Sequence, residues 1–229
     1  MISVMDILQR FSCQYLCPVL AILLLVLVMP ANAEDDFDFE TFDRIDAVNE
    51  GQLIFLTQTT TAPVHHHQNY ITILPDSLIS GWVTLQQCHL QLDSVARAQV
   101  VYNAERTRQL KIVSSSGIDR SWVDGHTVQL EGITPSAKLC ISAETRAFWP
   151  DEQGGFTLYN GPFMRQFLDG YYPMEVTLTI DYPEQLLSFH SANPINQPGF
   201  QIENRSGQLT VHALFEGRLT TQLRFDHSL

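Results

Sequence analysis

The stretch MEVTLTIDY, from Met174 to Tyr182, alternates apolar and polar side chains with a period of two. Its apolar members before the final tyrosine are Met174, Val176, Leu178 and Ile180. Successive side chains of a β-strand point to opposite faces, so the pattern predicts a strand with one face in a core and the other in water. The strand therefore belongs to a sheet with one covered face.

Similar short runs recur after residue 50, separated by turn signals roughly every 8–15 residues. They span residues 52–58, 69–74, 81–90, 98–102, 109–114, 126–130, 139–143, 206–215 and 218–225. About ten such strands predict an all-β fold, an antiparallel β-sandwich or partly open barrel with at most one or two short helices. Glu216-Gly217 predicts the turn of a C-terminal hairpin. Residues 162–169 predict a helix of one or two turns, because Pro162 suits a first helical position and Gly170 a cap.

The first 33 residues have the order of a secretory signal peptide. Arg10 precedes an apolar run, VLAILLLVLVM, which ends at Met29, and Ala31-Asn32-Ala33 predicts cleavage before Glu34. The run is short for a membrane span of roughly 20 residues, although adding residues 16–18 makes it a marginal anchor. We expect a periplasmic or secreted protein, with a retained anchor as the alternative.

The remaining chain divides at residue 50. Residues 34–50, EDDFDFETFDRIDAVNE, are dense in like charges and predict an acidic flexible leader, or alternatively a docking segment. Residues 51–229 are expected to form a single β-sandwich domain. The net charge of −12, with Lys111 and Lys138 as the only lysines, excludes nucleic acid as an expected partner. We expect a partner among envelope or extracellular proteins, and a membrane only if the signal segment is retained.

Two cysteines, Cys88 and Cys140, remain after the signal region. In an oxidising compartment they predict one disulfide, which closes a loop of about 52 residues. Two separate buried thiols are the alternative.

The triplet His65-His66-His67 is the main candidate for metal chemistry. Alternate residues of an extended chain share a face, so His65 and His67 would point together, and a neighbouring strand could add His89. Neutral imidazoles suit copper or zinc. A solvated loop is the alternative, and no other cofactor is expected.

Aromatic side chains with an arginine and a carboxylate make a candidate binding face. It comprises Trp149, Arg165, Asp169, Tyr171 and Tyr172. Large rigid rings beside directed polar groups are typical of recognition surfaces. The same residues would also suit a core edge and a turn.

Acid–base chemistry has weaker support. Asp124, His126 and Asp169 are candidate groups of a carbohydrate-active or hydrolytic enzyme, although a tight turn shaped by Asp124-Gly125 is the favoured interpretation of that segment. No nucleophile elbow, phosphate loop or dinucleotide fingerprint is present. The sequence favours a non-enzymatic binding or assembly module of the cell envelope over a metal-binding protein or an exported enzyme.

Overall fold

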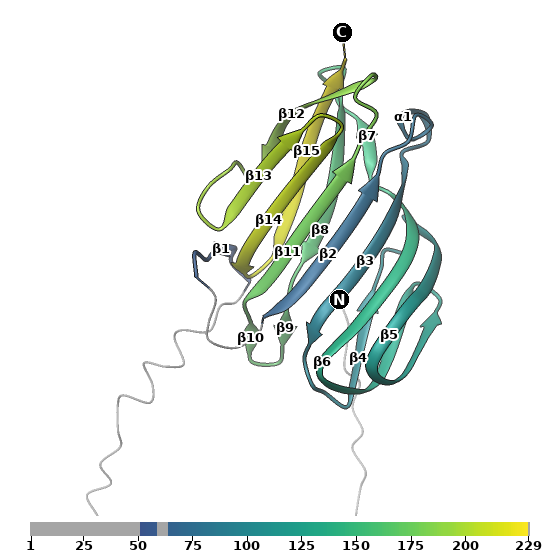
Figure 1. The fold of residues 1–229 in the computed structure, drawn as a ribbon, viewed down its shortest axis with the longest axis vertical. Helices are drawn as coiled ribbons and strands as arrows, with labels where there is room; N and C mark the ends of the chain where they lie inside the picture. The colour runs from purple at the N-terminus through teal and green to yellow at the C-terminus, as the bar shows by residue number, and fades with distance from the viewer. Residues whose placement is uncertain (1–50, 59–63, 229) are drawn as a thin grey trace, which may run out of the picture. The chain divides into compact units, whose positions relative to one another are not determined.

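The computed structural model describes residues 51–58 and 64–228, all within the unit Glu40–Leu229. Nearly all of this part is β-structure, arranged as two packed sheets and a small hairpin (Figure 1). The predicted signal sequence, residues 1–33, and acidic leader, residues 34–50, lie outside the described residues. Within them the α-helix is the four-residue α1 (Ser77–Ser80), and no helix there is long and apolar enough to cross a membrane.

The larger sheet has nine strands. They are β1 (Ile54–Phe55), β2 (His65–Thr72), β3 (Trp82–Leu92), β4 (Arg97–Val101), β5 (Thr107–Asp124), β6 (Thr127–Arg146), β11 (Met174–Asp181), β13 (Phe200–Arg205) and β14 (Gln208–Glu216). The order is β1-β14-β11-β2-β3-β6-β4, with β13 also paired to β14 and β5 to β6. Neighbours are antiparallel except β2 and β11, which are parallel. The all-β prediction is confirmed.

The smaller sheet has four strands in the order β12-β15-β8-β7. They are β7 (Phe148–Pro150), β8 (Phe156–Phe163), β12 (Leu187–Asn193) and β15 (Leu219–His227). A two-stranded hairpin, β9 (Gln166–Phe167) and β10 (Gly170–Tyr171), follows β8.

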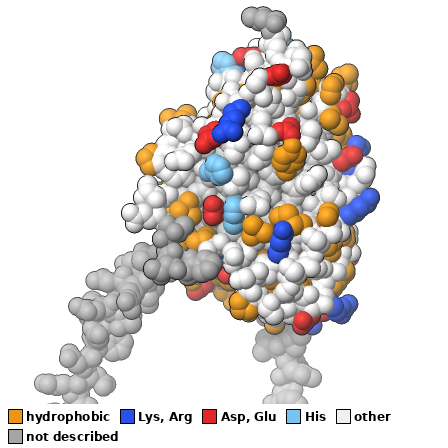
Figure 2. Space-filling model, viewed as in Figure 1, with side chains coloured by type: hydrophobic (Ala, Val, Ile, Leu, Met, Phe, Trp, Pro, Cys, Tyr) orange, Lys and Arg blue, Asp and Glu red, His pale blue; other side chains and the backbone are white. Residues whose placement is uncertain are grey.

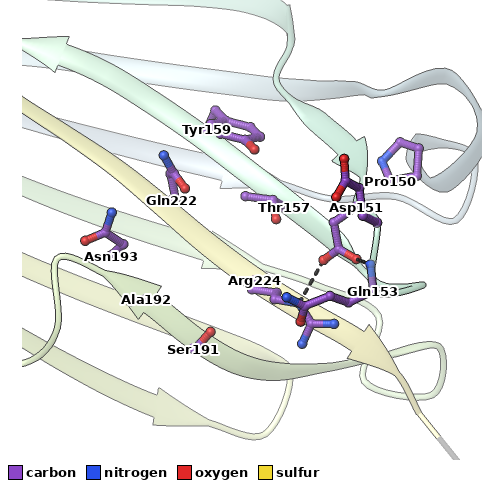
Figure 3. A pocket seen from close by; sticks show the side chains of 11 residues that line it. Pro150, Asp151, Gln153, Thr157, Tyr159, Ser191, Ala192, Asn193, Gln222 and Arg224 are labelled. Carbon is purple, nitrogen blue, oxygen red and sulfur yellow. Dashed lines mark hydrogen bonds and ion pairs between the residues drawn. The ribbon is translucent and has the colours of Figure 1, made fainter.

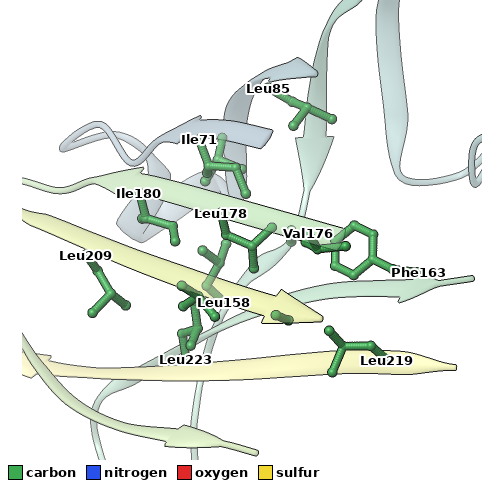
Figure 4. Close-up of a cluster of buried hydrophobic side chains, with 14 of the residues drawn as sticks. Ile71, Leu85, Leu158, Phe163, Val176, Leu178, Ile180, Leu209, Leu219 and Leu223 are labelled. Carbon is green, nitrogen blue, oxygen red and sulfur yellow. The ribbon is translucent and has the colours of Figure 1, made fainter. Parts of the chain in front are cut away.

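The core lies between the two sheets, where the alternating strands bury their apolar faces (Figure 4). On β11 the predicted apolar positions are buried, and Leu178 and Ile180 are fully enclosed. Leu158 and Leu223 meet them from the smaller sheet. Complete burial of one such side chain contributes about 1.5–3 kcal/mol, so this face supplies the main cohesion of the two layers.

Strands β5 and β6 form one long hairpin whose turn contains Gly125, at φ 59°. The pattern separates the runs 109–114, 126–130 and 139–143, but apart from His126, which lies in the turn, they are parts of these two continuous strands. Register shifts between the two strands explain the difference, because each irregularity interrupts the alternation of side chains. The turn predicted at Asp124-Gly125 is confirmed.

The helix predicted over residues 162–169 is wrong. Phe163 ends β8, and the following residues form the β9–β10 hairpin, in which Gly170 pairs with Phe167. Gly170 has φ 136°, a conformation that suits glycine in a turn and not a helix cap of regular geometry. Proline and a short apolar spacing were therefore insufficient evidence for a helix.

The predicted C-terminal hairpin is also wrong. β14 belongs to the larger sheet and β15 to the smaller one, so the two strands do not pair. The chain passes between layers at Glu216-Gly217, where Gly217 adopts φ 86°. Alternation identifies a strand but not the sheet to which it belongs.

Cys88 and Cys140 are joined by a disulfide, as predicted. They stand directly opposite each other on β3 and β6, with Cα atoms 4.1 Å apart. Figure 2 shows one face of the molecule, where acidic and basic side chains are interspersed and no patch of a single sign dominates.

Candidate ligand pocket between the sheets

Polar side chains replace apolar ones along part of the inner face of β2 and β3. His67 stands opposite His89 and Asn69 opposite Gln87, while the next inward pair is the apolar Ile71 and Leu85. His67 is 7% exposed and His89 only 4%. The sheet thus carries a buried polar patch at the end of an apolar row.

The three predicted histidines are close neighbours in this patch. Nε2 of His65 lies 3.2 Å from Nδ1 of His89. The rings of His67 and His89 stack with their centroids 4.3 Å apart, and the edge of Phe163 meets His67 at 5.2 Å. The sequence prediction that these histidines share a face is therefore confirmed by their positions.

Burial keeps these imidazoles uncharged. Loss of solvation lowers the pKa of His67 to about 3 and that of His65 to about 4, and places the pKa of His89 well below its ordinary value. At neutral pH each ring is therefore one donor and one acceptor.

Gln87 lies at the centre of the hydrogen-bond network. Its Nε2 donates to Oδ1 of Asn69 at 2.9 Å, and its Oε1 accepts from the Tyr102 hydroxyl at 2.5 Å and contacts Nε2 of His89 at 3.2 Å. Because an amide oxygen only accepts, Nε2 of a neutral His89 carries the hydrogen and its Nδ1 accepts from Nε2 of His65. The network fixes both rings.

A pocket of about 390 Å³ opens beside this network. It lies between the inner face of β2 and β3, the end of β4 and the end of β8, and its walls include Leu85, Val100 and Phe163. Two side chains in its lining, His67 and Asn160, each keep a buried nitrogen, Nε2 and Nδ2 respectively, without a hydrogen-bond partner among the described residues. An unsatisfied buried donor costs about 1–3 kcal/mol, so these nitrogens are unusual features of the pocket wall.

Among the described residues the histidine cluster is held together by a hydrogen bond and ring stacking. Within residues 51–58 and 64–228 no three His, Cys, Asp or Glu side chains are placed to hold one ion. His66 faces away from the other two members of the triplet, with its Nε2 2.9 Å from the Thr177 hydroxyl. The facing nitrogens of His65 and His89 are hydrogen-bonded to each other, so His89 offers no free lone pair there.

The predicted binding face is divided. Arg165, Asp169, Tyr171 and Tyr172 gather at the β9–β10 hairpin, while Trp149 lies on β7 at the other end of the described part (Figure 1). The Tyr172 hydroxyl donates to Asp169 at 2.6 Å, a contact that raises the pKa of Tyr172.

The remaining members of that face also have structural partners. The Tyr171 hydroxyl accepts from Nε of Arg218 at 2.7 Å. Arg165 makes a two-point ion pair with Asp93, with Nε 3.0 Å from Oδ2. The hairpin residues therefore fasten the loop to its neighbours.

The candidate acid–base groups do not share a site with the pocket. Asp124 and His126 flank the glycine of the β5–β6 turn, and Asp169 lies in the β9–β10 turn. None of the three lines the pocket between the sheets.

A second pocket, of about 500 Å³, lies on the outer face of the smaller sheet (Figure 3). Its charges pair with one another: Arg224 contacts Asp151 and Asp226, both at 2.8 Å. The backbone N–H of Gly155, together with those contacts, lowers the pKa of Asp151. The one arginine of this pocket is therefore already paired with carboxylates, and the lining also contains the acidic Glu152, so the pocket is not suited to an anion.

The sequence analysis missed Asn69, Gln87, Tyr102 and Asn160. The signal was present for the first two, because Asn69 and Gln87 lie at inward positions of strands whose next inward residues, Ile71 and Leu85, are apolar. A polar residue at an apolar position of the period indicates a buried polar site. Tyr102 and Asn160 join them only through the tertiary fold, so their sequence positions held no such signal.

No family model matches the chain, and no curated protein matches it. Among solved structures, a two-domain M1 zinc metallopeptidase variant bound to L-tryptophan is similar over 77% of this chain and 44% of that chain. The identity is 15% and the TM-score 0.37. The chain thus spans less than half of that protein, and a similarity this weak supports no argument about function.

Proposed function

We propose that this protein is an exported, periplasmic or secreted β-sandwich module of the cell envelope that binds a small ligand in the pocket between its sheets. The observation that carries the proposal is the pair of buried nitrogens, Nε2 of His67 and Nδ2 of Asn160, without partners beside the Gln87 hydrogen-bond network. The Cys88–Cys140 bond supports export, since disulfides persist in oxidising compartments. We assign binding and not catalysis to the pocket, and expect another envelope or extracellular protein as partner.

A fragment screen observed by ¹⁵N–¹H NMR on the full chain tests the binding role. Bound fragments are expected to shift amide signals of β2, β3 and the end of β8. Asn160→Leu should lower the affinity for these fragments by about fivefold or more, as expected for loss of a buried donor. Asn193→Leu, a matched change in the outer pocket, should leave these affinities unchanged. Fragments that shift only the amide signals of other surfaces would overturn the proposal.

Export is tested by sequencing the N-terminus of protein recovered from fractionated cells. We expect Glu34 as the first residue, outside the cytosolic fraction. Cytosolic protein that retains Met1 would contradict export while leaving the pocket unaffected.

Metal binding is the second candidate function, favoured by the contact between His65, His67 and His89. A copper or zinc ion would require the His65–His89 hydrogen bond to open. Calorimetric titration of the protein with each ion should give a saturable event that His65→Gln abolishes and His126→Gln retains. Equal affinity in the two variants would exclude the cluster as the metal site.

A further inference from the structure

The arginines of the described residues are not equally neutralised. Six of the nine pair with a carboxylate: Arg97, Arg108, Arg120, Arg165, Arg205 and Arg224. The three that do not are Arg106, Arg146 and Arg218, and Arg218 instead donates to the Tyr171 hydroxyl. In a chain of net charge −12, an arginine without a carboxylate partner is the exception.

Both of the other two unpaired arginines line the pocket between the sheets. Arg106 and Arg146 are neighbours, since the backbone N–H of Arg146 donates to the carbonyl of Arg106 at 2.9 Å. The Arg146 guanidinium stacks on Trp149, 4.5 Å from the ring centroid. This contact holds the guanidinium in place without neutralising its charge. Two positive side chains thus extend from neighbouring backbone positions of one pocket wall without a carboxylate partner, which favours an anion beside them.

The rest of the pocket lining is consistent with this charge. No aspartate or glutamate belongs to it, although the chain has 25 acidic residues. Leu85, Val100 and Phe163 supply an apolar wall, while His67 and Asn160 supply polar nitrogens without partners. Pockets for small organic ligands combine these features: apolar walls, few polar groups and one charged anchor.

We propose that the pocket binds a small amphipathic organic anion. Its carboxylate or phosphate group lies against Arg106 and Arg146, and its apolar body lies against Leu85, Val100 and Phe163. Guanidinium groups bind both kinds of oxyanion through paired N–H donors, so the anionic group is the shared chemistry. This inference rests on the proposed binding function and names the ligand class of the same site.

Three probes of one size test the charge requirement by calorimetry on the full chain: phenylacetate, phenyl phosphate and the neutral phenylacetamide. At least one anion should bind about tenfold more tightly than the amide, with an affinity that falls as salt is raised. The stronger anion identifies the head group as carboxylate or phosphate.

Charge variants locate the anion. Arg106→Gln combined with Arg146→Gln should remove most of this preference, by about tenfold, while amide binding changes little. Both side chains are exposed, so the core is retained, and Arg106→Gln alone, which leaves the Trp149 stack intact, should give a partial loss. Arg97→Gln combined with Arg205→Gln removes the same net charge from paired surface arginines and should leave all affinities unchanged.

Two results would overturn the anion assignment. Equal binding of the anions and the amide at this pocket would remove the charge requirement but leave the proposed function standing. Absence of any anion binding up to about 10 mM, a range in which even weak specific contacts register, would refute the ligand class. The fragment screen decides the binding function independently of both results.

Discussion

His65 and His89 face each other diagonally across the β2–β3 pair, with Nε2 of His65 3.2 Å from Nδ1 of His89. The contact requires one nitrogen to carry a hydrogen and the other to accept it. Neutral rings meet this requirement, whereas in two protonated rings both nitrogens carry hydrogens. Gln87 holds the other side of His89 through its Oε1. This contact is therefore lost when both rings are protonated.

Acid should destabilise the fold through these histidines. The folded pKa values of His65 and His67, about 4 and about 3, lie below the ordinary value of 6.5, so the unfolded chain binds more protons between these limits. Their stabilising contribution is complete above pH 6.5 and is lost as the pH falls to about 4 for His65 and about 3 for His67. For His65 the loss at pH 5 is on the order of 2 kcal/mol.

Urea unfolding at pH 7 and pH 5 measures this effect. His65→Gln should lose less stability than the wild type between the two pH values. His126→Gln, in the exposed β5–β6 turn, should show the wild-type difference. Identical pH dependence in all three proteins would show that His65 does not contribute.

Removal of the disulfide should weaken the fold without changing its topology. Cys88 and Cys140 are separated by 52 residues, and closing a loop of that size restricts the unfolded chain by roughly 4 kcal/mol in the chain-entropy model. The Cys88→Ala, Cys140→Ala double variant should therefore unfold at lower urea concentration with a far-ultraviolet spectrum like that of the wild type. An unchanged midpoint would mean that native strain cancels the gain.

The fold class followed from the sequence because alternation reports directly which face of a strand is buried. Met174–Asp181 shows the full pattern, and the structure buries each predicted position. Sheet membership did not follow, as β14 and β15 show, because period-two patterns are the same in either layer. The length of β5 could not be predicted either, because its register shifts break the period that identifies a strand.

The candidate site was only half visible in the sequence. His65, His67 and His89 were identified because alternate positions share a face. Arg106 and Arg146 carried no such signal, because their significance is the absence of a carboxylate nearby in three dimensions. Sequence gives the residue type, whereas pairing of charges is a property of the tertiary structure.

The Arg165–Asp93 ion pair should stabilise the loops beside the histidine patch. Arg165 also donates from Nη1 to the carbonyl of Pro173 at 3.1 Å, so it fastens the loop after β3 to the loop before β11. Both charged groups are partly shielded from solvent, so Arg165→Gln should cost about 1–3 kcal/mol. A double-mutant cycle with Asp93→Asn in chemical denaturation measures the coupling, and additive effects would show that the pair contributes nothing.

Gly161 should be the least replaceable residue of the pocket wall. It adopts φ 97°, and a Cβ there would lie 2.5 Å from the carbonyl oxygen of Leu219 on the paired strand. That conformation alone costs a non-glycine residue about 1–3 kcal/mol, and the collision with backbone adds to it. Gly154 separates the two effects, since it has φ 82° but no atom within 4 Å of its Cβ position. Thermal unfolding should therefore show a larger loss for Gly161→Ala than for Gly154→Ala, because only the former must displace β15 from β8. Equal losses would attribute the whole effect to backbone conformation and would mean that the strands relax around the added methyl group.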